Sequence, residues 1–197
     1  MEQAEQMLVV TVQKAQQRAA YVTAYAKKAG EWIPVLGPFP AVVGKNGVTA
    51  NKREGDRKTP LGLYPIRYAF GTAVKPHGIH LPYRMVTRHD YWVDDPASPD
   101  YNRWVTCYAQ PKKYWNSFEK LSISAYKYAL VIGYNDDPPI AGAGSAIFLH
   151  VWRGPASYTA GCVALAEADV LRILRWLRPE SNPVIWIRTI QEEPVSI

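Results

Sequence analysis

The hydrophobic and polar positions of this chain form short runs, most of them bounded by proline or glycine. Runs rich in β-branched and aromatic residues predict strands over residues 7–12, 128–134, 146–152 and 184–188. Residues 15–28 fit a helix by their alanine content and a strand by the alternation of Tyr21, Thr23 and Tyr25. We favour a strand, because Ala29-Gly30 predicts a turn after which residues 31–35 can pair back.

Two stretches have helical spacing. Trp115, Phe118 and Leu121 predict one helix. The second prediction is a helix over residues 167–178, with one apolar stripe made of Val170, Ile173, Leu174 and Leu177. Acids in its first turn and arginines toward its end suit the helix dipole, and Pro179 ends it. The predicted architecture is an α+β domain, mostly β, with residues 1–197 forming a single domain.

Composition restricts the classes of function. The chain has 197 residues, of which 48% are hydrophobic and 20% charged, which is enough for a core and argues against disorder. Its net charge of +6 favours an anionic partner such as nucleic acid, a lipid surface or bacterial cell wall. No apolar run approaches the roughly 18 residues of a membrane span. The first residues are acidic and polar, so we expect either a cytosolic protein or a mature form without its export signal.

The two cysteines, Cys107 and Cys162, are too few for a disulfide framework or for a zinc site of their own. One disulfide and one catalytic thiol both remain open. His77, His80 and His89 do not have a convincing metal-ligand spacing, so we expect no metal.

Residues 147–165 contain the most informative chemistry. A strand places its side chains alternately on two faces, here Phe148, His150 and Trp152 on one face and Ile147, Leu149 and Val151 on the core face. After a loop, Cys162 and Ala164 share a face. If the two segments lie side by side, His150 and Cys162 can meet on the aromatic face.

An adjacent imidazole can take the proton of a thiol and activate it as a nucleophile. Gly161 would allow a substrate carbonyl to approach, and the N–H groups of Gly161 and Cys162 could stabilise an oxyanion. The alternative is an inert buried cysteine beside a strand histidine, and the residues alone leave it open.

At His150 and Thr159-Ala160-Gly161-Cys162 the sequence resembles the bacterial L,D-transpeptidase catalytic domain family. The family hallmark is a strand histidine, a loop, and then Ser/Thr-x-Gly-Cys. A second family pattern, Lys/Arg-Thr-Pro-x-Gly-x-Phe/Tyr-x-Ile, matches KTPLGLYPI at residues 58–66, downstream of GKNG at residues 44–47. The resemblance covers residues 44–187, and we interpret the second motif as scaffold.

The resemblance implies an L,D-transpeptidase-like β-sandwich or barrel with a few peripheral helices. It further implies that Cys162 is the nucleophile and His150 the general base and acid of a cysteine acyltransferase that crosslinks peptidoglycan peptide stems through a thioester, without cofactor or metal. A periplasmic or envelope location, cell-wall biogenesis, cell shape and carbapenem sensitivity follow from the same resemblance. We expect a monomer that binds no nucleic acid and has no integral membrane segment.

The chain departs from the commoner family pattern. Where many members have Ser-His-Gly-Cys-Ile-Arg, Ala160 replaces the histidine and Val163-Ala164 replaces Ile-Arg. His150 is therefore the only histidine near the nucleophile in sequence. Arg153 is the candidate substitute for the missing arginine, and the chain looks like a divergent branch.

The candidate substrate-binding residues are Arg153, Trp152, Gly161, Tyr101, Asn102, Arg103 and Tyr134. Tyr101, Asn102 and Arg103 offer donors for a peptide stem, and the preferred alternative is a well-hydrogen-bonded surface loop. Six basic residues against two acids between Lys45 and Arg67 favour an anionic wall polymer or a solvated face. Two other functions remain open: an L,D-carboxypeptidase or amidase that uses water as acceptor, and a non-catalytic wall-binding module.

Overall fold

The protein is built mainly of β-strands, and the computed structural model describes residues 3–190. The α-helix α1 spans Glu167–Trp176, and the short 3-10 helices are η1 (Pro111–Lys113), η2 (Ser124–Tyr126) and η3 (Pro179–Ser181). The strands are β1 (Gln6–Val12), β2 (Ala19–Lys28), β3 (Glu31–Val42), β4 (Val48–Thr49), β5 (Thr59–Pro60), β6 (Gly62–Gly71), β7 (Tyr83–Met85), β8 (Asp90–Val93), β9 (Arg103–Thr106), β10 (Phe118–Lys120), β11 (Ala129–Ile132), β12 (Phe148–Val151), β13 (Val163–Leu165) and β14 (Val184–Thr189). The expected mostly-β class is confirmed.

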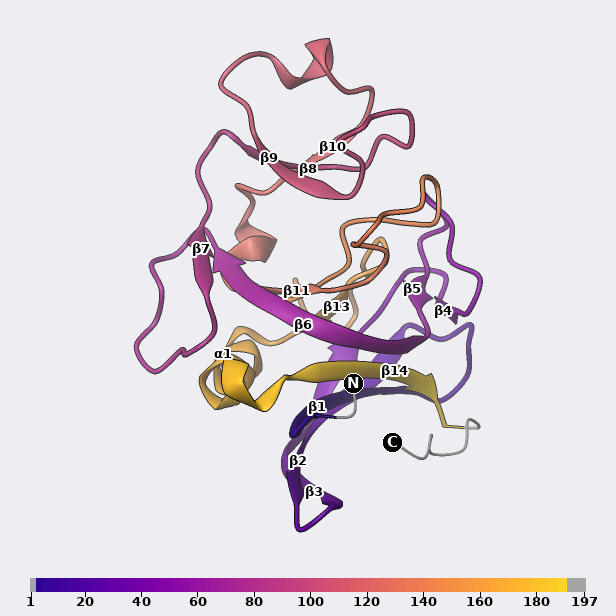
Figure 1. The fold of residues 1–197 in the computed structure, drawn as a ribbon. Helices are drawn as coiled ribbons and strands as arrows, with labels where there is room; N and C mark the ends of the chain where they lie inside the picture. Colours follow the sequence, from indigo (N-terminus) through magenta and orange to yellow (C-terminus); the bar gives the residue numbers. More distant parts are fainter. Residues whose placement is uncertain (1–2, 191–197) are drawn as a thin grey trace.

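Eight strands close into a barrel. Their hydrogen-bonded order is β11-β12-β13-β3-β2-β1-β14-β6, and an additional pairing joins β6 back to β11. Strand β6 pairs with two neighbours through different residues: residues 62–65 pair with β14, and residues 66–70 pair with β11. Strand β7 continues the sheet beyond β6. Figure 1 shows β6 crossing the middle of the molecule between β14 and β11.

Alternate strand residues fill the barrel. The largest apolar cluster includes Leu8, Val10 and Val12 of β1, Leu130 and Ile132 of β11, Leu149 of β12, Val163 and Leu165 of β13, and Ile185 and Ile187 of β14. The apolar stripe of α1 joins this cluster. Because alternate side chains of a strand face opposite sides, the other half of each strand points out of the barrel. The site must therefore lie on an outer face.

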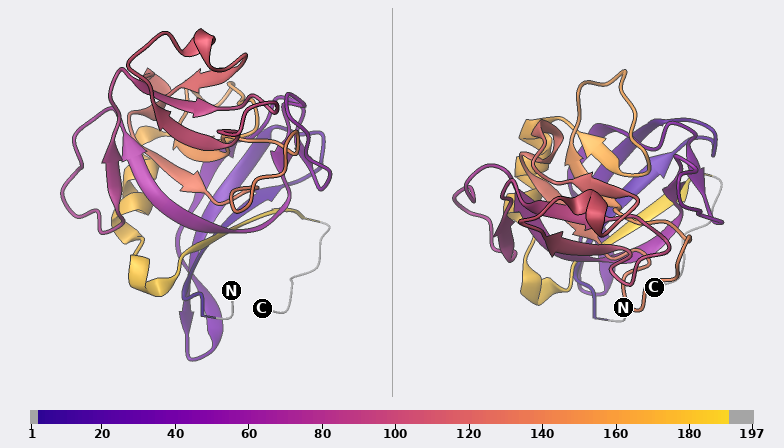
Figure 2. Two further views of the ribbon diagram at one scale, coloured as in Figure 1. Left: turned by 45° about the horizontal axis from the view of Figure 1, so that its top comes forward. Right: turned by 90° about the horizontal axis from the view of Figure 1, so that it is seen from above.

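A small three-stranded sheet, ordered β10-β8-β9, covers one outer side of the barrel. Figure 1 and the left view of Figure 2 show this sheet at the top of the molecule. We call residues 90–126, which contain this sheet and η2, the covering segment. A second apolar cluster lies between this segment and the barrel. Phe70, Val131, Phe148 and Cys162 come from the barrel side, and Trp92, Leu121 and Tyr126 come from the covering segment. The outer face of β12, which includes His150, is therefore covered rather than solvated.

Most of the predicted elements are confirmed. The ambiguous stretch at residues 15–28 contains β2, which pairs with β3 in a hairpin that extends below the barrel in Figure 1. Ala29 and Gly30 both have positive φ (50° and 88°), as the two-residue turn of such a hairpin requires. The four other predicted strands correspond to β1, β11, β12 and β14, and the predicted second helix is α1, which ends at Trp176.

The predicted helix through Trp115, Phe118 and Leu121 is wrong. Residues 118–120 form β10, which pairs antiparallel with β8, and the chain before it turns through η1. Asp95 holds that turn by accepting hydrogen bonds from the backbone and side-chain nitrogens of Asn116. The helical spacing arose because a turn and a short strand direct Trp115 and Phe118 into one apolar cluster.

Candidate active site

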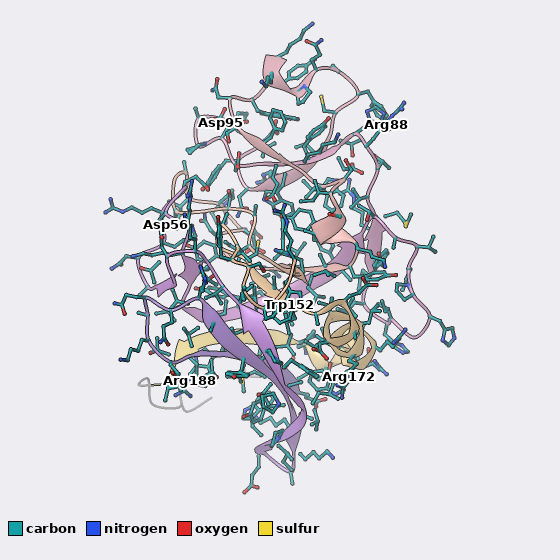
Figure 3. All side chains as sticks on the ribbon, turned by 180° about the vertical axis from the view of Figure 1, so that it is seen from behind. Asp56, Arg88, Asp95, Trp152, Arg172 and Arg188 are labelled. Atoms are coloured by element: carbon teal, nitrogen blue, oxygen red, sulfur yellow. The ribbon has the colours of Figure 1, made fainter. Side chains whose placement is uncertain are left out.

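A cavity of about 770 Å³ opens where the covering segment meets the barrel. Its polar and charged lining includes Lys52, Glu54, Asp94, Glu119, Tyr126, His150, Arg153 and Cys162. Figure 3 shows the lining residue Trp152 near the middle of the molecule, between α1, marked by Arg172, and the segment that holds Asp95. A second cavity of about 570 Å³ is lined by several prolines and by neither cysteine nor histidine. The first cavity is therefore the candidate site.

The predicted pair of Cys162 and His150 lies on one face of two adjacent strands. Strands β12 and β13 are parallel, with His150 opposite Ala164 and Leu149 opposite Val163. Cys162 precedes Ala164 by two residues, so it shares the His150 face, about 6.6 Å farther back along the strand. Phe148 and Cys162 belong to the outer cluster, while Leu149 and Val163 belong to the barrel core. The predicted division of faces is confirmed.

The Cys162 thiol is protonated at rest. It donates to the carbonyl of Ala146 at 3.2 Å and accepts from the N–H of Phe148 at 3.4 Å. Burial raises its pKa far above the ordinary value, and the nearby Glu119 raises it further, against opposing effects of the Phe148 N–H and Lys52. A buried cysteine of this kind needs a base to become a nucleophile.

His150 is a neutral base with a fixed tautomer. Its Nδ1 lies 2.9 Å from the carbonyl oxygen of Val151, which can only accept, so Nδ1 donates and Nε2 keeps the lone pair. Burial lowers the pKa of His150 to about 4, although the bond to Val151 favours the charged form. Near neutral pH, the resting state is therefore a neutral thiol and a neutral imidazole on the same face.

Two threonines fix the backbone at Cys162. The Thr159 hydroxyl donates to the carbonyl oxygen of Cys162 at 2.6 Å and accepts from the N–H of Gly161 at 3.1 Å. Thr59, from the KTPLGLYPI motif, donates to the same carbonyl at 3.3 Å and accepts from the N–H of Gly44. The motif interpreted as scaffold therefore contacts Cys162 directly.

Charged residues surround the pair. The Tyr126 hydroxyl donates to a carboxylate oxygen of Glu119. Burial raises the pKa of Glu119 to about 7, and Asp94 and Glu54 raise it further, against the hydrogen bond from Tyr126. Lys52, whose side chain is only 3% exposed, forms a 2.7 Å ion pair with Asp56. Asp94 and Glu119 thus come from the segment that covers the barrel, whereas Glu54 comes from the same loop as the buried cation Lys52.

These charged and phenolic residues had no distinct signal in the sequence. In the sequence, Lys52 and Glu54 are only two of the charged residues between positions 45 and 67. Asp94 begins a stretch rich in aspartate and proline that is typical of turns. Glu119 fell inside the wrongly predicted helix. Tyr126 lies in a 3-10 turn, which has no strong periodicity.

The structure brings some of the predicted substrate residues to the cavity. Trp152, Arg153 and Gly161 line it, and Arg153 is exposed at its rim. A Cβ on Gly161 would lie 3.1 Å from the carbonyl oxygen of Lys58, so this position is crowded. Tyr101 is outside the lining but donates to Glu54, a lining residue, at 2.6 Å.

The remaining predicted substrate residues lie elsewhere. Asn102 accepts from Trp92 and from the N–H of Ala146, and it donates to the carbonyls of Tyr134 and Asn135. Its amide therefore ties loops together rather than facing the cavity. Arg103 is exposed on β9, and Tyr134 donates its hydroxyl to Ala143.

Within residues 3–190, no group of three or more histidine, cysteine or acidic side chains is placed to hold a metal ion. Cys107 and Cys162 are both free thiols. No helix in this part of the chain has the length and apolar character needed to cross a membrane.

A model of the YkuD family, described as the L,D-transpeptidase catalytic domain, matches residues 8–187. No curated protein matches the chain. Among solved structures, the helical cell shape determining protein Pgp2 from Campylobacter jejuni is similar at 14% identity with a TM-score of 0.46, and a mutant of it at 16% with a TM-score of 0.42. Each match covers 95% of this chain and 49% of the other, so the chain spans about half of their length. Likenesses this low carry no argument about activity.

Proposed function

The chain belongs to the YkuD family of L,D-transpeptidase catalytic domains, and we propose that it is a cysteine acyltransferase that crosslinks peptidoglycan peptide stems. In this proposal, Cys162 forms a thioester acyl-enzyme and His150 serves as general base and then general acid. We further propose that the protein works in the cell envelope, where peptidoglycan lies.

The observation that supports the proposal best is the placement of one thiol and one imidazole on the same face of two paired strands. Both side chains line a cavity large enough for a peptide segment. The His150 tautomer leaves Nε2 as the acceptor, which is the form that a general base requires. The thiol bonds to backbone groups at rest, and catalytic hydrogen bonds of this kind commonly form only when substrate binds.

Acylation begins when the thiol leaves the Ala146 carbonyl and attacks a stem-peptide carbonyl carbon. Sγ forms the new C–S bond as the thiol proton passes to Nε2 of His150. The N–H of Cys162 is the donor that we assign to the developing oxyanion, since the N–H of Gly161 already donates to Thr159. The C–N bond then breaks, the imidazolium protonates the departing amine, and the acyl group stays on sulfur.

Transfer reverses these steps with a new amine. The acceptor amine of a second stem attacks the thioester while His150 Nε2 takes its proton. The C–S bond breaks, the sulfur leaves as thiolate, and the imidazolium returns a proton to it. Water in place of the amine would give hydrolysis by the same route, so the acceptor alone separates a transpeptidase from an L,D-carboxypeptidase.

Incubation with tetrapeptide muropeptides tests the proposal, with intact-mass spectrometry of the protein and chromatography of the products. We expect an acyl adduct on Cys162 and crosslinked dimers. Cys162→Ala and Cys162→Ser should form neither, since a serine hydroxyl is far harder to deprotonate. His150→Ala should fold and fail to acylate.

The matched control is Cys107→Ala, which removes the other buried cysteine, in an apolar cluster with Val93 and Trp115. It should form the adduct at the native rate. Shortened monomers without dimers would show that water is the acceptor. No adduct in any variant, with muropeptides or with a carbapenem-type β-lactam, would mean a non-catalytic domain.

A further inference from the structure

We propose that Tyr126, held by Glu119, is a positioning residue for His150. The inference rests on the proposed function, because it assigns a support to the proposed base. The ring centroids of Tyr126 and His150 lie 5.2 Å apart with their planes at 84°. Tyr126 is 3% exposed, so its ring is enclosed by its neighbours.

The Tyr126 ring is itself fixed by other aromatic rings. It packs edge to face against Phe148 at 5.5 Å and against Phe70 at 5.6 Å. Phe148 and His150 are alternate residues of β12, so one tyrosine ring covers both side chains of that face. A ring packed against three partners leaves the imidazole little room to turn about its Cβ–Cγ bond.

The hydroxyl of Tyr126 connects this packing to the small sheet. It donates to Glu119 of β10, a strand that pairs with β8. Burying a phenol and a carboxyl group costs free energy that a phenylalanine with an apolar partner would avoid. The polar pair therefore does more than fill space, and its position beside His150 and Cys162 in one cavity indicates what it serves.

The two restraints on His150 are complementary. The Val151 carbonyl holds Nδ1 and so selects the tautomer, while Tyr126 holds the plane of the ring. During acylation the imidazole must become an imidazolium without losing its aim at Cys162. If the base is displaced by about an ångström, the enzyme still binds substrate but the proton transfer becomes slower. Positioning therefore affects kcat rather than KM.

The charge of Glu119 gives the pair a second, measurable signature. Glu119 faces Tyr126, Asp94 and Glu54, and its charge acts on Cys162, where Lys52 opposes it. When Glu119 ionises, it disfavours the negative charge that develops on the sulfur. Acylation by the native protein should therefore slow as pH rises past about 7, which is the pKa of Glu119.

The variants Tyr126→Phe and Glu119→Gln test this assignment, with acylation rates measured from pH 5 to 9 by intact mass using a carbapenem-type β-lactam. Tyr126→Phe keeps the ring and loses the bond to Glu119, so kcat should fall about tenfold at pH 6, where Glu119 is protonated in both proteins, with KM unchanged. Glu119→Gln keeps an acceptor for the Tyr126 hydroxyl and loses the charge. It should match the native rate at pH 6 and exceed it several-fold at pH 8.

The control is Tyr83→Phe, which removes a phenol that donates to the Ala73 carbonyl at 2.8 Å outside the cavity. It should acylate at the native rate, with a melting temperature close to that of Tyr126→Phe. The assignment is overturned if Tyr126→Phe stays within twofold of native across the pH range, or if Tyr83→Phe loses as much. If the native protein itself is not acylated, the proposed function fails, and that result is distinct from either of these.

Discussion

Gly44 forms an isolated parallel β-bridge with Thr159, and this bridge joins the two motifs that surround Cys162. The N–H of Lys45 donates to the Thr159 carbonyl at 2.9 Å, and the N–H of Gly44 donates to the Thr59 hydroxyl at 2.9 Å. Thr59 and Thr159 in turn both donate to the Cys162 carbonyl. The backbone at Gly44 therefore sets the distance between the KTPLGLYPI motif and the loop that presents Cys162.

Replacing Gly44 by alanine should disturb both stability and activity. An added Cβ would lie 2.4 Å from the carbonyl oxygen of Arg57 and 2.8 Å from the Cα of Lys58, both of them backbone atoms that cannot simply rotate away. We expect Gly44→Ala to lower the free energy of unfolding by about 3 kcal/mol and to slow acylation, because Thr59 must shift. Urea unfolding and intact-mass kinetics measure the two effects.

Gly30→Ala is the control for that prediction. Gly30 sits at the tip of the β2–β3 hairpin with φ +88° and open space around its would-be Cβ. Alanine there should cost about 1 kcal/mol of backbone strain and leave acylation unchanged. An equal loss of activity in both variants would contradict the role given to Gly44.

The sequence predicts which side chains share the His150 face because strands obey a two-residue period. That Cys162 lies on the same face depended on the two segments being neighbours, which the parallel pairing of β12 with β13 supplies. The barrel-forming strands are predictable for the same reason, since each buries one apolar face. The closure of the barrel by β6 is not predictable, because it depends on which strands become neighbours, and the pairing of β6 with β11 contains a register shift between Leu130 and Ile132 that no local pattern encodes.

The acidic side of the site could not be predicted, and the cause is the covering segment. Its strands are three or four residues long, which is too short to show a clear period. The positions of its aromatic residues depend on how they pack in the cluster between the small sheet and the barrel, and not on a regular spacing. Glu119 reaches the cavity only because β10 pairs with β8, a contact that helical spacing conceals. The shifted ionisation of His150 and Cys162 likewise depends on burial, which no local motif encodes.

Thr159→Val should damage the site more than its small change in volume suggests. Valine removes the donor to the Cys162 carbonyl and the acceptor for the Gly161 N–H, so two buried backbone groups lose a partner. We expect a loss of about 2 kcal/mol in unfolding free energy and slower acylation. Thr159→Ser keeps the hydroxyl and should restore most of both. If valine and serine behave alike, the hydroxyl does not fix the nucleophile.

Lys52→Met should reduce the reactivity of Cys162. The buried ammonium opposes the rise in the Cys162 pKa and is paired with Asp56, whose other oxygen accepts from the N–H of Arg53 at 2.9 Å. Because the Asp56 carboxylate is partly exposed and can be hydrated, removing the ammonium should cost less than breaking a fully buried pair, about 1 kcal/mol, and the rate of iodoacetamide labelling at pH 8 should fall. Lys127→Met, which breaks an exposed 2.6 Å pair with Glu167, should change the free energy of unfolding little, because water screens such a pair, and it should leave labelling unchanged.

His150 and Glu119 should make opposite contributions to the pH dependence of stability. The folded pKa of His150 is about 4 against 6.5 in the unfolded chain, so the unfolded state binds more protons between these values and stability rises with pH there. The folded pKa of Glu119 is about 7 against 4.5, so the folded state binds more protons and stability falls as pH rises through that window. Each effect amounts to about 3 kcal/mol at most, and between pH 4.5 and 6.5 they largely cancel.

When either group is removed, the free energy of unfolding should therefore show the pH dependence that the other group contributes. In Glu119→Gln, the free energy of unfolding measured by urea titration should rise relative to the native protein as pH increases from about 4.5 to 7, because the falling contribution of Glu119 is gone. In His150→Asn it should fall relative to the native protein as pH increases from about 4 to 6.5, because the rising contribution of His150 is gone. The comparison uses differences between proteins, so the surface carboxylates that all three share drop out. Parallel pH curves for the three proteins would show that neither group is held in its uncharged form by the fold, and the neutral resting pair at the candidate site would have to be abandoned.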